Sequence, residues 1–446
     1  MNSGFPSYSD PTRKLIAHIR DLSLSTQDFL QTFPSQNPDD PAKYRSKREQ
    51  LWLIRAAWKS LHFYVQPAVD ANTLNVPTEL VQLLTQRVRA IDNCESLEFA
   101  VIHTDKLNYF QFPPGDFQQT VIDLGDVVSA KWAFPPDLGL IALPHSQAQH
   151  LFLNGLLAHE IGHFVFAKLN CFDRITAAIS EGLRAAFAPP IDTALNATQL
   201  QQFPEVLQDW AEELFCDLFG VYLLGPSFVL ASIELFDLPN ILAADGTMDA
   251  RAAGSQFKFE WSHPARLFRL SRQTALLESL GWWNAISENG SHHIRIMDLC
   301  RNLRQGSFSY EEVVAPLGSK IIDAFFRTVE SIEAEVARVT EKLRNGDGRA
   351  REIAEFVELK DVISTYLCQA VIPSTLFVGN EFRKPSAIVL LNAAHLFYLS
   401  GIEDLMSNSD KPDLSDIRQR DIWMERVENW TTKGLEDIAL PNERGG

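Results

Sequence analysis

The sequence has few cysteines, no basic run and no long apolar stretch. Its five cysteines are odd in number and scattered without CxxC spacing, which excludes a disulfide framework and favours a reducing compartment. With 40 basic and 57 acidic side chains the formal charge is −17, which disfavours binding to nucleic acid or anionic lipid. No segment approaches the roughly 18–20 apolar residues of a membrane span, and the N-terminus shows no secretory signal. We therefore expect a cytoplasmic protein without a membrane span.

The patterns that are present divide the chain into three parts. Residues 1–95 place apolar side chains at three- and four-residue steps, which predicts helices. From about Ser96, four short runs rich in β-branched and aromatic residues predict a small antiparallel sheet: "LEFAVIH", "LNYFQF", "QTVIDL" and "LGLIALP". Helical patterns then continue to the C-terminal region. The predicted fold class is mainly α (α+β), with an N-terminal helical region at 1–95, a central domain at 96–275 and a C-terminal helical region at 276–446.

A heptad-like seam lies between Lys320 and Leu343. Its apolar residues step alternately by three and four positions, namely Ile322, Phe325, Val329, Ile332, Val336, Val339 and Leu343. Such a seam packs either inside the chain's own helical bundle or against a second chain. The first interpretation is favoured, and a homodimer or partner contact through the 320–343 helix stays open as the alternative.

The stretch "LLAHEIGHFV" contains His159-Glu160-x-x-His163. Residues four apart lie on one face of a helix, so the two histidines can present two imidazole nitrogens to one metal ion. Glu160 lies beside them and can reach a water bound to that metal. A catalytic zinc site needs a third protein ligand and an open fourth position. Alone, the motif also fits a core or surface histidine pair.

A second segment, "DWAEELFCDLFGVYLLGPSF", supplies the missing ligand. Glu213 and Asp217 lie four apart within an apolar run, where acidic groups need a partner. Glu213 can complete a His-His-Glu site for one Zn²⁺. Asp217 can accept a hydrogen bond from the other ring nitrogen of His159. Glu212 and Cys216 remain alternative ligands, although a small buried thiol is the ordinary interpretation of Cys216.

Together these segments resemble the gluzincin metallopeptidases, in which two helices carry the HExxH motif and the third-ligand glutamate. "WSHPARLFRL", with His263, Pro264 and Arg269, is similar to the HP…R segment of the HtpX and CAAX prenyl endopeptidase group. The chain resembles soluble relatives of that group over about residues 138–272. The resemblance implies a zincin-like catalytic core with two metal-binding helices, embedded in helical flanking regions. Through "ELFCDLFGVYLLGP" the chain also resembles the ImmA/IrrE type of regulatory peptidase, which ranks second.

The resemblance also implies roles for particular side chains. His263 and Arg269 would approach the bound peptide, with Arg266 as an alternative to Arg269. The general base would be Glu160, acting on a water whose pKa the zinc lowers. Tyr222 is a further candidate for stabilising the developing oxyanion.

The expected function is therefore a soluble zinc metalloendopeptidase that hydrolyses peptide or protein substrates. The run at residues 138–144 is expected to form an edge strand that pairs with an extended peptide. A zinc-binding but proteolytically silent regulatory protein of the same fold, which binds a partner, stays open as the alternative.

Overall fold

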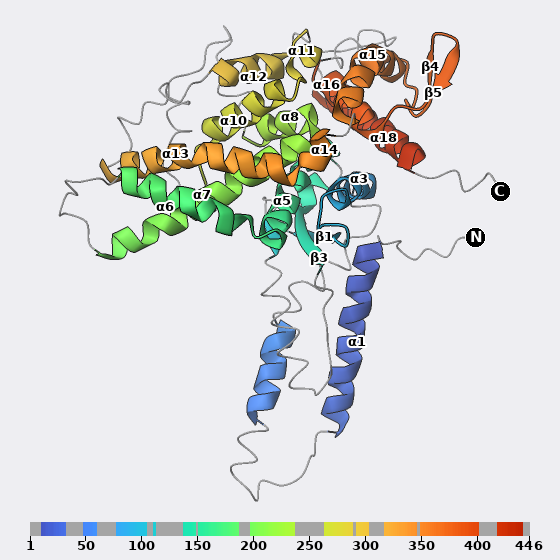
Figure 1. The fold of residues 1–446 in the computed structure, drawn as a ribbon. Coiled ribbons are helices and arrows are strands. Elements are labelled where there is room, and N and C mark those ends of the chain that lie inside the picture. The colour runs from blue at the N-terminus through green and yellow to red at the C-terminus, as the bar shows by residue number, and fades with distance from the viewer. Residues whose placement is uncertain are drawn as a thin grey trace, which may run out of the picture. The chain divides into compact units, whose positions relative to one another are not determined.

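The computed structural model describes residues 10–32, 48–59, 77–104, 110–112, 137–148, 150–186, 197–236, 263–288, 291–302, 316–345, 348–400 and 417–439. The chain is mainly helical, as predicted (Figure 1). It divides into two compact units, of which the first comprises Met1–Val81 and Ser96–Gln149 and the second Gln82–Glu95 and His150–Gly446. These limits differ from the boundaries at 95 and 275 expected from the sequence, and the three-domain division stays a prediction.

The first unit contains N-terminal helices and one sheet. α1 (Asp10–Thr32) and residues 48–59 are helical, as the apolar spacing predicts. The sheet consists of β1 (Glu98–Thr104), β2 (Phe110–Phe112) and β3 (Leu138–Pro144), and the 3₁₀ turn η1 (His145–Gln147) follows it. α1 contacts β1, where the Lys14 ammonium donates to both carboxylate oxygens of Glu98 at 2.7 and 2.6 Å.

The sheet is mixed, so the antiparallel expectation is confirmed only in part. β2 pairs with β3 antiparallel, whereas β1 pairs with β3 in parallel register, from Glu98 opposite Leu138 to Thr104 opposite Pro144. Near-continuous apolar runs are typical of parallel strands that are buried on both faces. A parallel pair needs a crossover of a dozen or more residues, and the segment between β1 and β3 is long enough to provide it. The expected strand "QTVIDL" lies outside the described residues.

The expectation that residues 138–144 form an edge strand is wrong. β3 is the central strand of the order β1-β3-β2, and all 7 of its residues are buried. Its backbone groups are bonded to β1 on one side and to β2 on the other. β2 covers β3 from Leu140 to Ala142, so a peptide does not meet a free edge over that part of the strand.

The second unit is built almost entirely of helices. α3 (Thr78–Arg89) begins in the first unit and ends in the second. The remaining elements are η2 (Leu153–Leu156), α5 (Leu157–Lys168), α6 (Cys171–Ala186), α7 (Ala197–Leu224), α8 (Pro226–Leu235), α10 (Arg266–Ser279), α11 (Trp283–Ile286), α12 (His292–Asn302), α13 (Pro316–Val339), α14 (Glu341–Asn345), α15 (Gly348–Cys368), the antiparallel hairpin β4 (Leu376–Val378) and β5 (Glu381–Arg383), α16 (Ala387–Ser400) and α18 (Ile417–Ala439).

α13 buries its heptad-like seam inside the chain. The helix lies along α6 and α7 (Figure 1), and Ile332 and Val336 are completely buried. Phe325 meets Trp210 of α7 edge to face, with ring centroids 5.2 Å apart. Burial of each such side chain contributes about 1.5–3 kcal/mol to folding. Packing within the chain is confirmed from Ile322 to Val339, whereas Leu343 lies on α14 and is half-buried. A homodimer or partner contact through this helix stays a prediction.

α16 is a largely buried helix that contains two buried polar side chains. Asn392 and His395 are both fully buried. The Oδ1 of Asn392 accepts a hydrogen bond from the backbone N–H of Ser227 at 2.7 Å, and the Ser227 hydroxyl lies 2.9 Å from Nδ1 of His395. No helix in the described part of the chain has the length and apolar character needed to cross a membrane.

Candidate metal centre

The two motif-bearing helices approach each other closely at one point. α5 is buried from Leu157 to Phe166 and packs along α7. A Cβ added to Gly162 would lie 3.0 Å from Cα and 3.1 Å from Sγ of Cys216. Such contacts are tighter than ordinary van der Waals separation, so glycine is what allows the two backbones to approach. The motif residues are thereby brought against α7.

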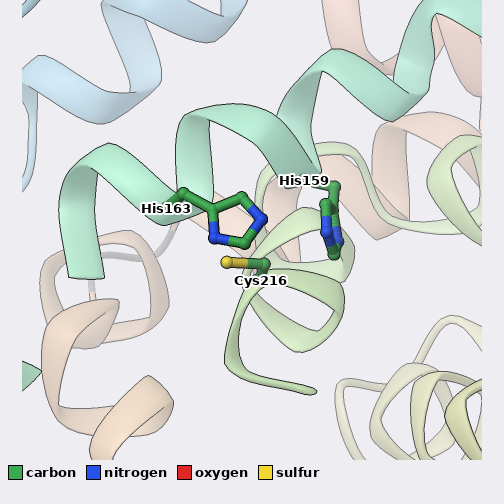
Figure 2. Close-up of side chains that lie close together, drawn as sticks. All are labelled: His159, His163 and Cys216. Carbon is green, nitrogen blue, oxygen red and sulfur yellow. The ribbon is translucent and has the colours of Figure 1, made fainter. Parts of the chain in front are cut away.

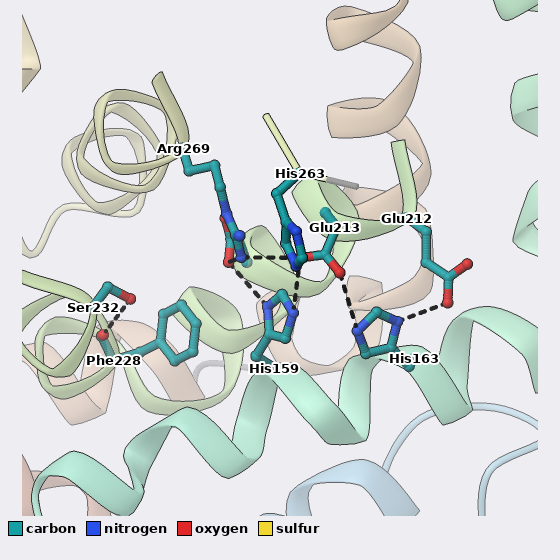
Figure 3. Close-up of polar contacts among 9 residues, drawn as sticks. His159, His163, Glu212, Glu213, Phe228, Ser232, His263 and Arg269 are labelled. Atoms are coloured by element: carbon teal, nitrogen blue, oxygen red, sulfur yellow. Dashed lines mark hydrogen bonds and ion pairs between the residues drawn. The ribbon is translucent and has the colours of Figure 1, made fainter. Parts of the chain in front are cut away.

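Both histidines turn one ring nitrogen toward Glu213 (Figure 3). Nε2 of His159 lies 3.3 Å from Oε2 of Glu213, and Nε2 of His163 lies 3.6 Å from Oε1 of the same carboxylate. Both histidines are buried, at 8% and 9% exposure. The His-His-Glu constellation predicted from the sequence is therefore assembled in space.

The other nitrogen of each ring contacts a second carboxylate. Nδ1 of His159 lies 3.0 Å from Oδ1 of Asp217, and Nδ1 of His163 lies 2.7 Å from Oε1 of Glu212. A carboxylate can only accept, so each Nδ1–H donates and each Nε2 can offer a lone pair to a metal. The contact between His159 and Asp217 was predicted. Glu212 was considered only as a ligand, and its contact with His163 was missed.

Two of the donor separations lie near those of a tetrahedral metal site, and they reach the two different oxygens of Glu213. Zinc bonds imidazole nitrogen and carboxylate oxygen at about 2.0–2.2 Å, which places neighbouring donors of a tetrahedron about 3.3–3.5 Å apart. The 3.3 and 3.6 Å separations between the Nε2 atoms and Glu213 are close to this value. Oε2 of Glu213 is also completely buried without a hydrogen bond. The same oxygen lies 3.2 Å from a guanidinium nitrogen of Arg269 and 3.3 Å from Nε2 of His159, so donors and positive charge surround it.

The charges around the centre favour a cation as well. Burial lowers the pKa of His159, but the charge of Glu213 and the hydrogen bond with Asp217 outweigh it and raise that pKa to about 10. Burial raises the pKa of Glu213, but the charges of His159 and Arg269 outweigh it and hold that pKa well below its usual range. The Glu213 carboxylate is thus ionised and the His159 ring retains its proton, which a metal ion would displace.

Cys216 offers a second set of three donors. Its Sγ and one ring nitrogen from each of His159 and His163 lie within 4.8 Å of one another (Figure 2). We favour Glu213 as the third ligand because both Nε2 atoms turn toward its carboxylate. Burial raises the pKa of the Cys216 thiol well above its ordinary value, and the surrounding carboxylates raise it further. These effects disfavour the thiolate that binds metal.

Arg269 lies against the carboxylates of Asp217 and Glu213. Its guanidinium donates from Nε to Oδ2 and from the terminal nitrogen to Oδ1 of Asp217, at 2.6 and 2.8 Å. The same terminal nitrogen lies 3.2 Å from Oε2 of Glu213. Arg269 is only 8% exposed, and the charge of the guanidinium outweighs the burial of Asp217 to lower the pKa of that carboxyl to about 2. This geometry suits a positioning residue better than one that contacts peptide.

The other candidates occupy different environments. Nε2 of His263 lies 3.5 Å from Oε2 of Glu213 while 43% of its side chain is exposed, so it bridges the centre and the solvent. Arg266, the alternative to Arg269, is exposed at the start of α10. Tyr222 is 4% exposed and stacks under the guanidinium of Arg349, 5.1 Å from the ring centroid, which is a core environment.

Glu160 is buried at 7% exposure on α5, between the two histidines in sequence. Its negative charge raises the pKa of the Cys216 thiol, so the Glu160 carboxylate lies within electrostatic reach of Cys216 on α7.

Comparison with models of protein families, with curated proteins and with solved structures finds no match to this chain.

Proposed function

We propose that the protein is a zinc-dependent metalloendopeptidase of the gluzincin type. One observation carries the proposal: both motif histidines direct Nε2 toward the carboxylate of Glu213, while each Nδ1 contacts a different carboxylate. A histidine pair that only filled a core would not need four carboxylate contacts of this kind. Orientation of metal-binding histidines by a second carboxylate is common in zinc sites.

His159, His163 and Glu213 would hold the ion. When bound, Zn²⁺ would supply Lewis acidity, lowering the pKa of a water and polarising a carbonyl. Glu160 would take a proton from that water as general base and deliver it to the departing amine. Asp217 and Glu212 would keep the imidazole rings in the required tautomer and orientation.

The roles of His263 and Arg269 are refined by their positions. His263, partly exposed beside Glu213, is the side chain that we propose to meet the bound peptide and the developing oxyanion. Arg269 would act through Asp217 and Glu213 as a positioning residue. A cytoplasmic location is proposed as well, on the scattered cysteines of the sequence alone.

The test combines metal analysis with peptide cleavage. The purified protein should bind one zinc ion and cleave members of an unbiased peptide library. Glu160→Gln should retain zinc and thermal stability but lose about 10²–10⁴-fold in turnover, the range of a general base. Glu181→Gln, an exposed glutamate on α6, is the matched control and should cleave like the wild type.

Two results would change the conclusion. Zinc bound at one equivalent without cleavage by the wild type would favour the proteolytically silent, partner-binding alternative. Absence of zinc binding would contradict both functions.

A further inference from the structure

One face of α18 is buried in the second unit, and this face contains a glutamate, Glu428. Its fully buried apolar residues on this face are Val427 and Leu435, and Glu428 lies between the first of these and the buried Thr431. Glu428 is only 5% exposed. A carboxylate in such a position destabilises the docked helix when ionised unless nearby groups compensate for the lost solvation.

The compensating groups come from the segment that leads into the HExxH helix. The carboxylate of Glu428 accepts a hydrogen bond from the backbone N–H of Phe152. Its Oε2 also lies 3.7 Å from Nδ1 of His150. Phe152 directly precedes η2, and η2 runs into α5. Glu428 therefore ties the C-terminal helix to the beginning of the helical segment that carries the motif histidines.

A second carboxylate, Glu234 near the end of α8, interacts electrostatically with both Glu428 and His150. About a quarter of its side chain is exposed, at 24%, and its Oε1 lies 3.9 Å from Nε2 of His293. Glu428 and Glu234 repel each other, and His150 attracts both. We call Glu234 and Glu428 the carboxylate pair. The histidines beside the pair are His150, which is about half exposed and contacts Glu428, and His293, which lies beside Glu234.

We propose that α18 is a proton-dependent clamp, which docks on the segment before α5 while the carboxylate pair retains a proton and loosens when both acids are ionised. The clamp would set how firmly the motif helix is held, and it does not depend on whether the metal centre is catalytic.

The direction of the effect follows from the groups involved. Burial, followed by the charge of Glu428, raises the pKa of Glu234 from 4.5 to about 7. Burial raises the pKa of Glu428 as well. The hydrogen bond with Glu428 raises the pKa of His150 above 6.5. All three shifts mean that the docked state binds more protons than the undocked state, so rising pH favours release.

The pH window follows from the same values. Docking is tightest below about pH 4.5, weakens as the pH rises toward the folded pKa of Glu234 near 7, and weakens further as His150 loses its proton above 6.5. The charged and titratable groups that act on the carboxylate pair or on its neighbour Tyr398 are Glu425, Arg420 and Asp421 of α18, His150 before η2, His293 of α12 and Tyr398 of α16. None of them is a metal ligand of the candidate centre.

Hydrogen–deuterium exchange of the full chain tests the clamp. Peptides from 417–439 and from 150–156 should lose protection together between pH 5 and pH 7.5, by on the order of a hundredfold after correction for intrinsic exchange, because the pKa of Glu234 is raised from 4.5 to about 7. Peptides from α13, in the same unit, should keep their protection.

Variants of the pair separate the clamp from general effects of pH. Glu234→Gln removes the repulsion at nearly constant volume, so at pH 7.5 α18 should be at least about tenfold better protected than in the wild type. Glu428→Gln should act in the same direction and is the second test should the first variant fold poorly. Glu436→Gln, on the same helix but paired with Lys433 at the surface, should behave like the wild type. Protection of α18 that is constant with pH, or equally pH-dependent in both variants of the pair, would overturn the proposal.

Discussion

Replacement of Arg269 by methionine tests the role of this residue most directly. Methionine is similar in length and apolar, so it fills the space between α10 and α7 but cannot pair with Asp217. If Arg269 positions the ligands, Arg269→Met should weaken both folding and metal binding. If Arg269 contacts the substrate, only turnover of peptide should change.

The contacts set the magnitude. Arg269 makes two charge-assisted hydrogen bonds to Asp217, at 2.6 and 2.8 Å, in a site where both side chains are more than nine-tenths buried. Removal of one partner of a buried ion pair costs about 3–5 kcal/mol of unfolding free energy. Because Asp217 keeps its contact with His159, we expect a value near the lower end, about 3 kcal/mol. Loss of a group that supports a metal ligand should also reduce zinc affinity by about 10–100-fold.

The assay is denaturant unfolding with a chelator present, together with zinc titration by competition. Arg272→Met is the matched control, because Arg272 lies on the same helix but pairs with Glu333 where each is about one-third exposed. Its cost should stay below about 1 kcal/mol. In the double variant Arg269→Met with Asp217→Asn, the loss of unfolding free energy should be smaller than the sum of the two single losses by about 1–3 kcal/mol. Unchanged stability and zinc affinity in Arg269→Met, with loss of turnover alone, would refute the positioning role.

The remaining predictions concern the approach of α5 to α7. In the cobalt-loaded protein, Cys216→Ser should leave the near-ultraviolet spectrum unchanged and Glu213→Gln should weaken binding; a thiolate-to-cobalt band that disappears in Cys216→Ser would show that sulfur is the ligand. Gly162→Ala should destabilise the fold, because contacts of 3.0–3.1 Å with Cys216 force a shift costing about 1–3 kcal/mol, offset by roughly 1 kcal/mol of helix propensity. Gly348→Ala, with nothing within 4 Å, is the control, and a Gly162→Ala variant more stable than the wild type in urea would contradict the close contact.

The sequence predicted those features that depend on spacing along one element. A helix brings residues four apart to the same face, so the placement of His159 with His163 and of Glu213 with Asp217 followed directly. The same rule predicted the buried seam of α13. These features need no knowledge of how the elements are connected in space, because one helix fixes them.

Features that depend on the path between elements could not be predicted in this way. Apolar runs predicted the strands, but their direction depends on the route of the chain from β1 to β3, and the parallel pairing was missed. The long side chain of Arg269 can reach either solvent or the interior, and its position is decided by the buried charge of Asp217 on another helix. For the same reason the carboxylate pair, on α8 and α18, has no signature in the sequence.

The choice between Glu212 and Glu213 shows where the two kinds of information meet. Successive residues of a helix are rotated by about 100°, so residue 217 lies about 40° from residue 213 around the helix axis. Residue 212 lies about 100° from residue 213 on the other side. That rotation explains why Glu213 and Asp217 share a face, but it leaves Glu212 within reach of the neighbouring helix. The relative placement of α5 and α7 decides the outcome: it puts Glu213 between the two Nε2 atoms and Glu212 against Nδ1 of His163. Gly162 fixes that placement through its contact with Cys216, so a glycine without any donor atom determines which glutamate can become a ligand.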